Sequence, residues 1–165
     1  MRASGSGRYQ MMEGPVPAPD ELREAATDLS EKSMHVFHVS DNPVPGTNLY
    51  VVYVDNHPFP CHYTEEKGTL GFRVPGNFPE AGPEDSFFIV PPSVKLRTAD
   101  PVRATTDINR ASADPQHLQN VIPVQGPALV FSWHLWNKTK WDRRKHTLVD
   151  HYAHCIRRFE QPEHD

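Results

Sequence analysis

The chain has 165 residues, 17 prolines, two cysteines and a formal net charge of −4. This length suits one domain with one core, and the acidic balance lacks the basic surface that nucleic-acid-binding proteins need. No apolar run approaches the roughly 20 residues of a membrane-spanning helix, and the prolines argue against an all-helical bundle. So few cysteines indicate a reducing, cytoplasmic setting rather than a disulfide framework.

Residues 1–18 are rich in Gly, Ser and Pro, and we expect a disordered leader there. A helix is expected over residues 19–33, because acidic residues crowd its first turn, where they suit the positive end of the helix dipole. A narrow apolar stripe along it is formed by Leu22, Ala25, Ala26 and Leu29. The stripe indicates that this helix packs on a larger element.

Four strands are expected next. Residues 34–40 alternate between apolar and polar side chains, as a strand does. Residues 48–55 are aromatic and β-branched, with turn residues on both sides. Residues 69–74 and 86–90 have the same character, and Pro91-Pro92 ends the last strand.

The rest of the chain is expected to hold one irregular segment and one helix. Residues 93–126 lack periodicity, and so long an irregular stretch is typically functional. Residues 129–133 are expected to form a short extended piece, and residues 162–165 a tail. The apolar face of the helix expected over residues 141–159 carries Trp141, Leu148, Tyr152, Cys155, Ile156 and Phe159.

This order predicts one α+β domain over residues 19–161. We expect an N-terminal helix, a four-stranded antiparallel meander sheet, a long irregular segment that holds the active site, and a C-terminal helix. The helices would cover one face of the sheet.

Two stretches carry a family resemblance. The loop after the third expected strand contains Phe78-Pro79 and Gly82-Pro83. The second stretch reads Phe131-Ser132-Trp133-His134-Leu135-Trp136, then Trp141, then a helix that ends Ile156-Arg157-Arg158-Phe159. Together with the element order, these stretches resemble the ubiquitin-conjugating-enzyme superfamily, whose loop in this place reads roughly Tyr-Pro-x-x-Pro-Pro. The closer resemblance, over residues 69–159, is to its prokaryotic family E.

The chain departs from that superfamily at the nucleophile. An ordinary conjugating enzyme has His-Pro-Asn, then a reactive cysteine, then a tryptophan before the next helix. Here no cysteine lies between Val94 and Tyr152, and His57-Pro58-Phe59 comes too early to stand for His-Pro-Asn.

Ser132 and His134 are the candidate catalytic residues. In an extended segment, residues i and i+2 point to the same face, so both side chains can converge. A serine hydroxyl needs a base to take its proton, and imidazole suits that task. By resemblance, Trp136 and Trp141 would shape the site, and the side-chain amide of Asn109 or Asn120 would stabilise the oxyanion.

The resemblance implies a transferase that carries a ubiquitin-like protein in a bacterial conjugation pathway, with the cargo held on Ser132 as an oxyester. Its partners would be the ubiquitin-like protein, an activating enzyme and a deconjugating peptidase, with no nucleic acid and no membrane. The alternative is a non-catalytic adaptor on the same fold that binds a ubiquitin-like protein or its activating enzyme. The missing cysteine favours this alternative.

No metal or cofactor is expected. The histidine and cysteine spacings, around Cys61 and again at His151 and His154, do not complete a four-ligand zinc pattern. Cys61 is interpreted as a structural or incidental thiol, although the neighbouring His62 leaves thiol chemistry open. Cys155 is expected to behave as a small hydrophobic residue.

Overall fold

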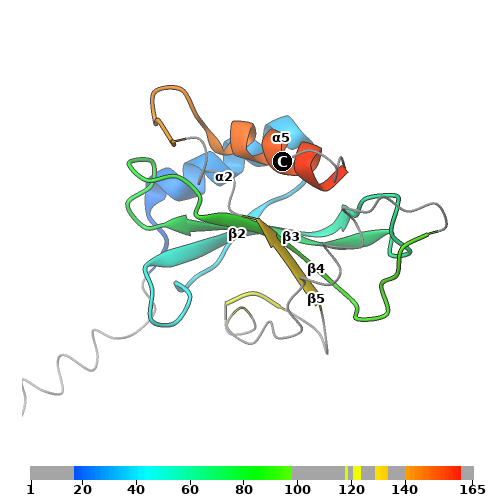
Figure 1. Cartoon of the computed structure of the whole chain (residues 1–165). Helices are drawn as coiled ribbons and strands as arrows, with labels where there is room; N and C mark the ends of the chain where they lie inside the picture. The colour runs from blue at the N-terminus through cyan, green and yellow to red at the C-terminus, as the bar shows by residue number, and fades with distance from the viewer. Residues whose placement is uncertain (1–16, 98–117, 119–120, 124–128, 134–139, 161–165) are drawn as a thin grey trace, which may run out of the picture.

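The computed structural model describes residues 17–97, 118, 121–123, 129–133 and 140–160, and it shows an α+β fold. Five antiparallel strands form an open sheet in the order β1-β2-β3-β4-β5. The strands are β1 (His38–Val39), β2 (Leu49–Pro58), β3 (Lys67–Pro75), β4 (Asp85–Val90) and β5 (Leu129–Trp133). The helices α2 (Asp20–Ser33) and α5 (Leu148–Glu160) lie on the same side of this sheet (Figure 1).

The expected four-stranded sheet is wrong by one strand. The piece at 129–133 is not an isolated extended segment, because it pairs with β4 from Val90↔Leu129 to Ser86↔Trp133. A long connection separates the two strands in the sequence, so local patterning gave no sign of the pairing. The first expected strand is also shorter, since only His38–Val39 of residues 34–40 pair with β2.

Helix α2 follows from its sequence. Asp20 and Glu21 occupy its first turn, and Leu22, Ala26 and Leu29 are buried. The helix ends where Met34 adopts a left-handed conformation, with φ 65°. The neighbouring Ser30 hydroxyl donates to the Ala26 carbonyl and accepts from the backbone N–H of Phe37, which ties the helix end to the chain entering β1.

Helix α5 begins later than expected. Trp141 does not belong to it, because the helix starts at Leu148 after a tight turn. Thr147 and Asp150 form a reciprocal cap: the Thr147 backbone N–H donates to the Asp150 carboxylate, and the Asp150 N–H donates to Thr147 Oγ1. This cap sets the helix start, so the apolar residue at 141 is left outside.

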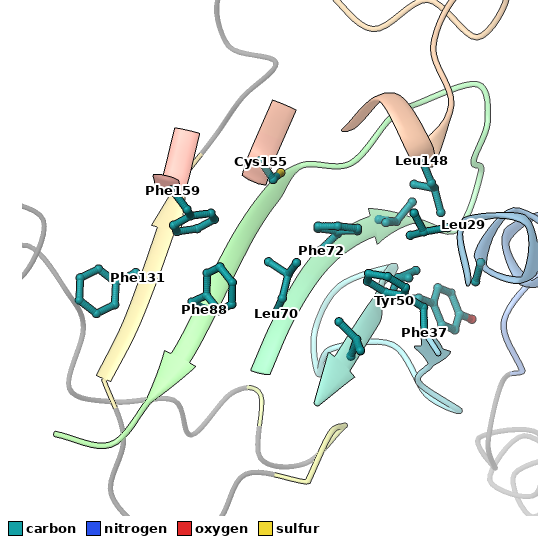
Figure 2. Packing of buried hydrophobic residues seen from close by; sticks show 14 of the residues in the cluster. Leu29, Phe37, Tyr50, Leu70, Phe72, Phe88, Phe131, Leu148, Cys155 and Phe159 are labelled. Atoms are coloured by element: carbon teal, nitrogen blue, oxygen red, sulfur yellow. The ribbon is translucent and has the colours of Figure 1, made fainter. Parts of the chain in front are cut away.

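The main core lies between the sheet and the two helices. Figure 2 shows Leu70, Phe72 and Phe88 from adjacent strands pointing toward Cys155 and Phe159 of α5. A second, smaller cluster covers the other face of the sheet, where Val44, Val51, Phe87, Ile89 and Val130 pack with Leu118 and Ile122. Both faces of the sheet are therefore buried. Neither of the described helices is long and apolar enough to cross a membrane.

Candidate functional site

Ser132 lies in β5, where it pairs with Phe87 of β4. Because the two strands are antiparallel, the end of β5 lies beside the start of β4. The loop at residues 76–84 leads directly into that start. Through Phe87, which also pairs with Gly71, the backbone of Ser132 lies level with the middle of β3 and not at the end of the sheet that carries this loop. His134, Trp136, Asn109 and Asn120 lie outside the described residues, so the pairing of Ser132 with His134 stays a prediction.

Trp141 packs directly on the loop at residues 76–84. Its indole Nε1–H donates to the Pro79 carbonyl at 2.8 Å, and its ring lies 5.8 Å from the ring of Phe78. The indole also sits against Gly82, where an added Cβ atom would lie 2.5 Å from Cγ and from Cε3 of Trp141. The residues that carry the resemblance in the loop therefore contact the tryptophan that precedes α5.

The loop itself is held by backbone hydrogen bonds. The Gly76 N–H donates to the Asn48 carbonyl at 2.8 Å, and the Glu84 N–H donates to the Arg73 carbonyl at 2.7 Å. Proline nitrogens carry no hydrogen, so Pro79 and the buried Pro83 add no donor that needs a partner. The peptide bond between Phe78 and Pro79 is cis. The two backbone hydrogen bonds hold both ends of the loop on which Trp141 packs.

A pocket of about 660 Å³, lined mostly by charged residues, borders the contact between Trp141 and the loop. Glu80 on the loop forms an ion pair with Arg143, which links the loop to the turn before α5. In that turn the Asp142 N–H donates to Nδ1 of His146 at 2.9 Å, and the His146 ring lies 5.6 Å from that of Trp141. Since Nδ1 accepts, the neutral His146 ring carries its hydrogen on Nε2.

The turn before α5 also lowers the pKa of the Asp142 carboxyl. The backbone N–H of Arg144 donates to this carboxylate, and that bond favours its ionised form. Glu80 and His146 were not singled out from the sequence, and Arg143 was interpreted there as a solvated helix charge. The structure instead places Arg143 before α5, paired with Glu80, and no local pattern pointed to this ion pair.

Comparison of the chain with protein-family models, curated proteins and solved structures found no significant match. The resemblance therefore rests on the residues quoted above and on the order of the elements.

A second set of reactive side chains lies buried between β4 and α5. Ser86 Oγ is 2.7 Å from Nε2 of His151 and 2.6 Å from Sγ of Cys155. Burial lowers the pKa of His151 to about 3 and raises that of Cys155 to about 12, so both are neutral. All three residues are shielded from solvent. The set can hold the helix on the strand, but no substrate reaches it.

Cys61 lies at the other end of the sheet. It follows β2 and precedes β3, whereas the loop at residues 76–84 follows β3. Strand β3, which separates Cys61 from that loop, spans about 27 Å at roughly 3.3 Å per residue. The exposed Cys61 thiol is therefore remote from Trp141. Within the described residues, no group of three or more His, Cys, Asp or Glu side chains is arranged to hold a metal ion.

Proposed function

We propose that this protein is a ubiquitin-conjugating-enzyme-like transferase of the prokaryotic family E type, working in a cytoplasmic bacterial pathway. The observation that carries the proposal is the contact of Trp141 with Pro79 and Gly82. It joins two stretches that are distant in sequence and that both resemble the family. An α+β fold with a meander sheet covered on one face by α2 and α5 supports it.

In the proposed reaction, Ser132 Oγ attacks the carbonyl carbon of a thioester that joins the ubiquitin-like protein to its activating enzyme. The serine proton passes to His134, and the expelled thiolate of the activating enzyme takes up a proton. The products are a serine oxyester and a free thiol. The amide of Asn109 or Asn120 would stabilise the tetrahedral oxyanion, because donors aimed at developing charge lower the barrier.

The proposed partners are the ubiquitin-like protein, its activating enzyme and a deconjugating peptidase of the same pathway. The loading experiment combines the purified chain with ATP and with an activating enzyme and a ubiquitin-like protein of a bacterial conjugation pathway. We expect an adduct on denaturing gels that survives dithiothreitol and is cleaved by mild alkali. Ser132→Ala abolishes this adduct.

Two variants make the loading experiment sharper. Ser132→Cys should convert the adduct into a thioester that dithiothreitol cleaves, which reports the identity of the attacking atom. Ser93→Ala is the matched control, because Ser93 is exposed and follows β4 at the far end of the sheet. An adduct that persists in Ser132→Ala, or that never forms on the unmodified chain, would reject the transferase.

The second candidate is a non-catalytic adaptor for a ubiquitin-like protein or its activating enzyme. The positions of the cysteines favour it: Cys155 is buried and Cys61 lies at the far end of the sheet. Calorimetry on the same partners separates the two candidates. Binding without an adduct, unchanged by Ser132→Ala, is the adaptor outcome.

A further inference from the structure

A pocket of about 450 Å³ opens at the end of the sheet opposite Trp141, between the chain after β2 and the last turn of α5. Its volume falls in the range of small-molecule sites, which are mostly apolar with a few placed polar groups. Phe59, Phe88 and Phe159 form its apolar wall, while Cys61 and Glu160 lie at its rim. The proposed transfer reaction uses none of these residues.

The wall of the pocket is fixed by ring contacts. Phe88 meets Phe159 edge to face, with ring centroids 4.6 Å apart, and meets Phe59 in the same way at 5.1 Å. Such pairs favour one arrangement of the rings. All three side chains belong to the main core, and Phe88, which has no exposed surface, fixes the positions of Phe59 and Phe159 from within it.

His57 lines the pocket without bringing a charge to it. Its Nδ1 hydrogen bonds to the Pro58 carbonyl at 2.9 Å, so Nε2 accepts from the Tyr152 hydroxyl at 2.7 Å. Both ring nitrogens are thus occupied. Burial, more than any other influence, lowers the pKa of His57 and keeps the ring neutral. A ligand meets this histidine as a ring surface.

Among the described residues, the charged side chain on the pocket lining is the exposed Glu160, and no lysine or arginine belongs to that lining. Within the same part of the chain no salt bridge joins Glu160. Arg157 and Arg158 precede it in the last turn of α5 but are not on the lining. The carboxylate at the rim therefore favours a cationic group over an anionic one.

We propose that this pocket binds a small organic ammonium ion, with its apolar body against Phe59, Ile156 and Phe159 and its cationic group at Glu160. This site is independent of the transferase proposal, because none of its lining residues takes part in the proposed transfer. Either can fail alone.

The test is an NMR titration of the ¹⁵N-labelled protein with three probes of similar shape: 2-phenylethylamine, 2-phenylethanol and 3-phenylpropionate. We expect the amine to shift the amide signals of Cys61, Ile156 and Glu160 to saturation. The alcohol should bind about threefold more weakly, as expected for loss of a partner at a rim carboxylate. The carboxylate probe should bind more weakly still. Equal affinity for amine and alcohol, or no saturable shift, would overturn the proposal.

Two variants and one modification complete the test. Glu160→Gln should make the amine and the alcohol bind with equal affinity. The control variant Glu31→Gln removes an exposed carboxylate on α2 and should leave both affinities unchanged. Alkylation of Cys61 with N-ethylmaleimide adds bulk at the pocket rim and should abolish binding, while the buried Cys155 is spared. Amine binding that persists after alkylation, or an equal effect of the two glutamine variants, would also overturn the proposal.

Discussion

Replacing Gly82 with alanine should disrupt the junction between Trp141 and the loop at residues 76–84. The added Cβ atom would lie 2.5 Å from Cγ and Cε3 of the indole, well inside van der Waals contact. The φ angle of Gly82 is outside the left-handed region, so the clash is purely steric. Overpacking of this kind costs about 1–3 kcal/mol. If the indole moves away, the loss of its hydrogen bond to the Pro79 carbonyl adds about 1 kcal/mol to the cost in stability.

Urea unfolding followed by far-UV circular dichroism measures this cost. Gly76→Ala is the matched control on the same loop, because its new Cβ atom would come no closer than 3.4 Å to Tyr50. We expect Gly82→Ala to lose about 2 kcal/mol more than Gly76→Ala. In a Trp141→Leu background that excess should vanish. Equal costs for the two alanine variants, or an excess that survives the removal of Trp141, would refute the contact.

Three further predictions concern the buried polar groups. The pKa of His151 is lowered in the folded state, so the stability that comes from keeping this ring neutral is present above pH 6.5 and is lost as the pH falls toward 3. Urea titrations of the wild type should show this loss of unfolding free energy, with a slope of up to about 1.4 kcal/mol per pH unit, whereas those of His151→Gln should not. Ellman's reagent should modify Cys61 in the native protein and Cys155 only on unfolding, and equal rates would contradict the burial. Asp85→Asn leaves Arg73 without its buried carboxylate partner and should lower the unfolding free energy by about 3 kcal/mol in urea titrations. A loss of less than about 1 kcal/mol would contradict a stabilising role for this pair.

Local patterning predicted the elements whose causes are local. The apolar stripe of α2 and the β-branched runs of β2, β3 and β4 place each element within a few residues of its observed bounds. Helix α5 was predicted to begin seven residues too early, because Trp141 shares helical periodicity with Leu148 and Tyr152. The pair Thr147 and Asp150 marked the true start.

Long-range features could not be predicted in this way. The pairing of β5 with β4, and the fit of the Trp141 indole on Gly82, join positions separated by long stretches of chain. Neither contact produces a pattern that can be seen in a short stretch of sequence. The cluster of Ser86, His151 and Cys155 has the same origin, because it forms only when α5 docks on β4. The sequence relates only His151 and Cys155, which lie one helical turn apart, and it gives no sign of Ser86.

Mapping the loaded residue tests whether Ser132 accepts the ubiquitin-like protein, as we propose. After loading under ATP, the adduct is digested with protease at mildly acidic pH, which preserves esters, and the peptides are sequenced by mass spectrometry. We expect the C-terminal remnant of the ubiquitin-like protein on the Ser132 hydroxyl, and none on the Ser132→Ala chain. A remnant on Cys61 or on a lysine, with Ser132 unmodified, would contradict it.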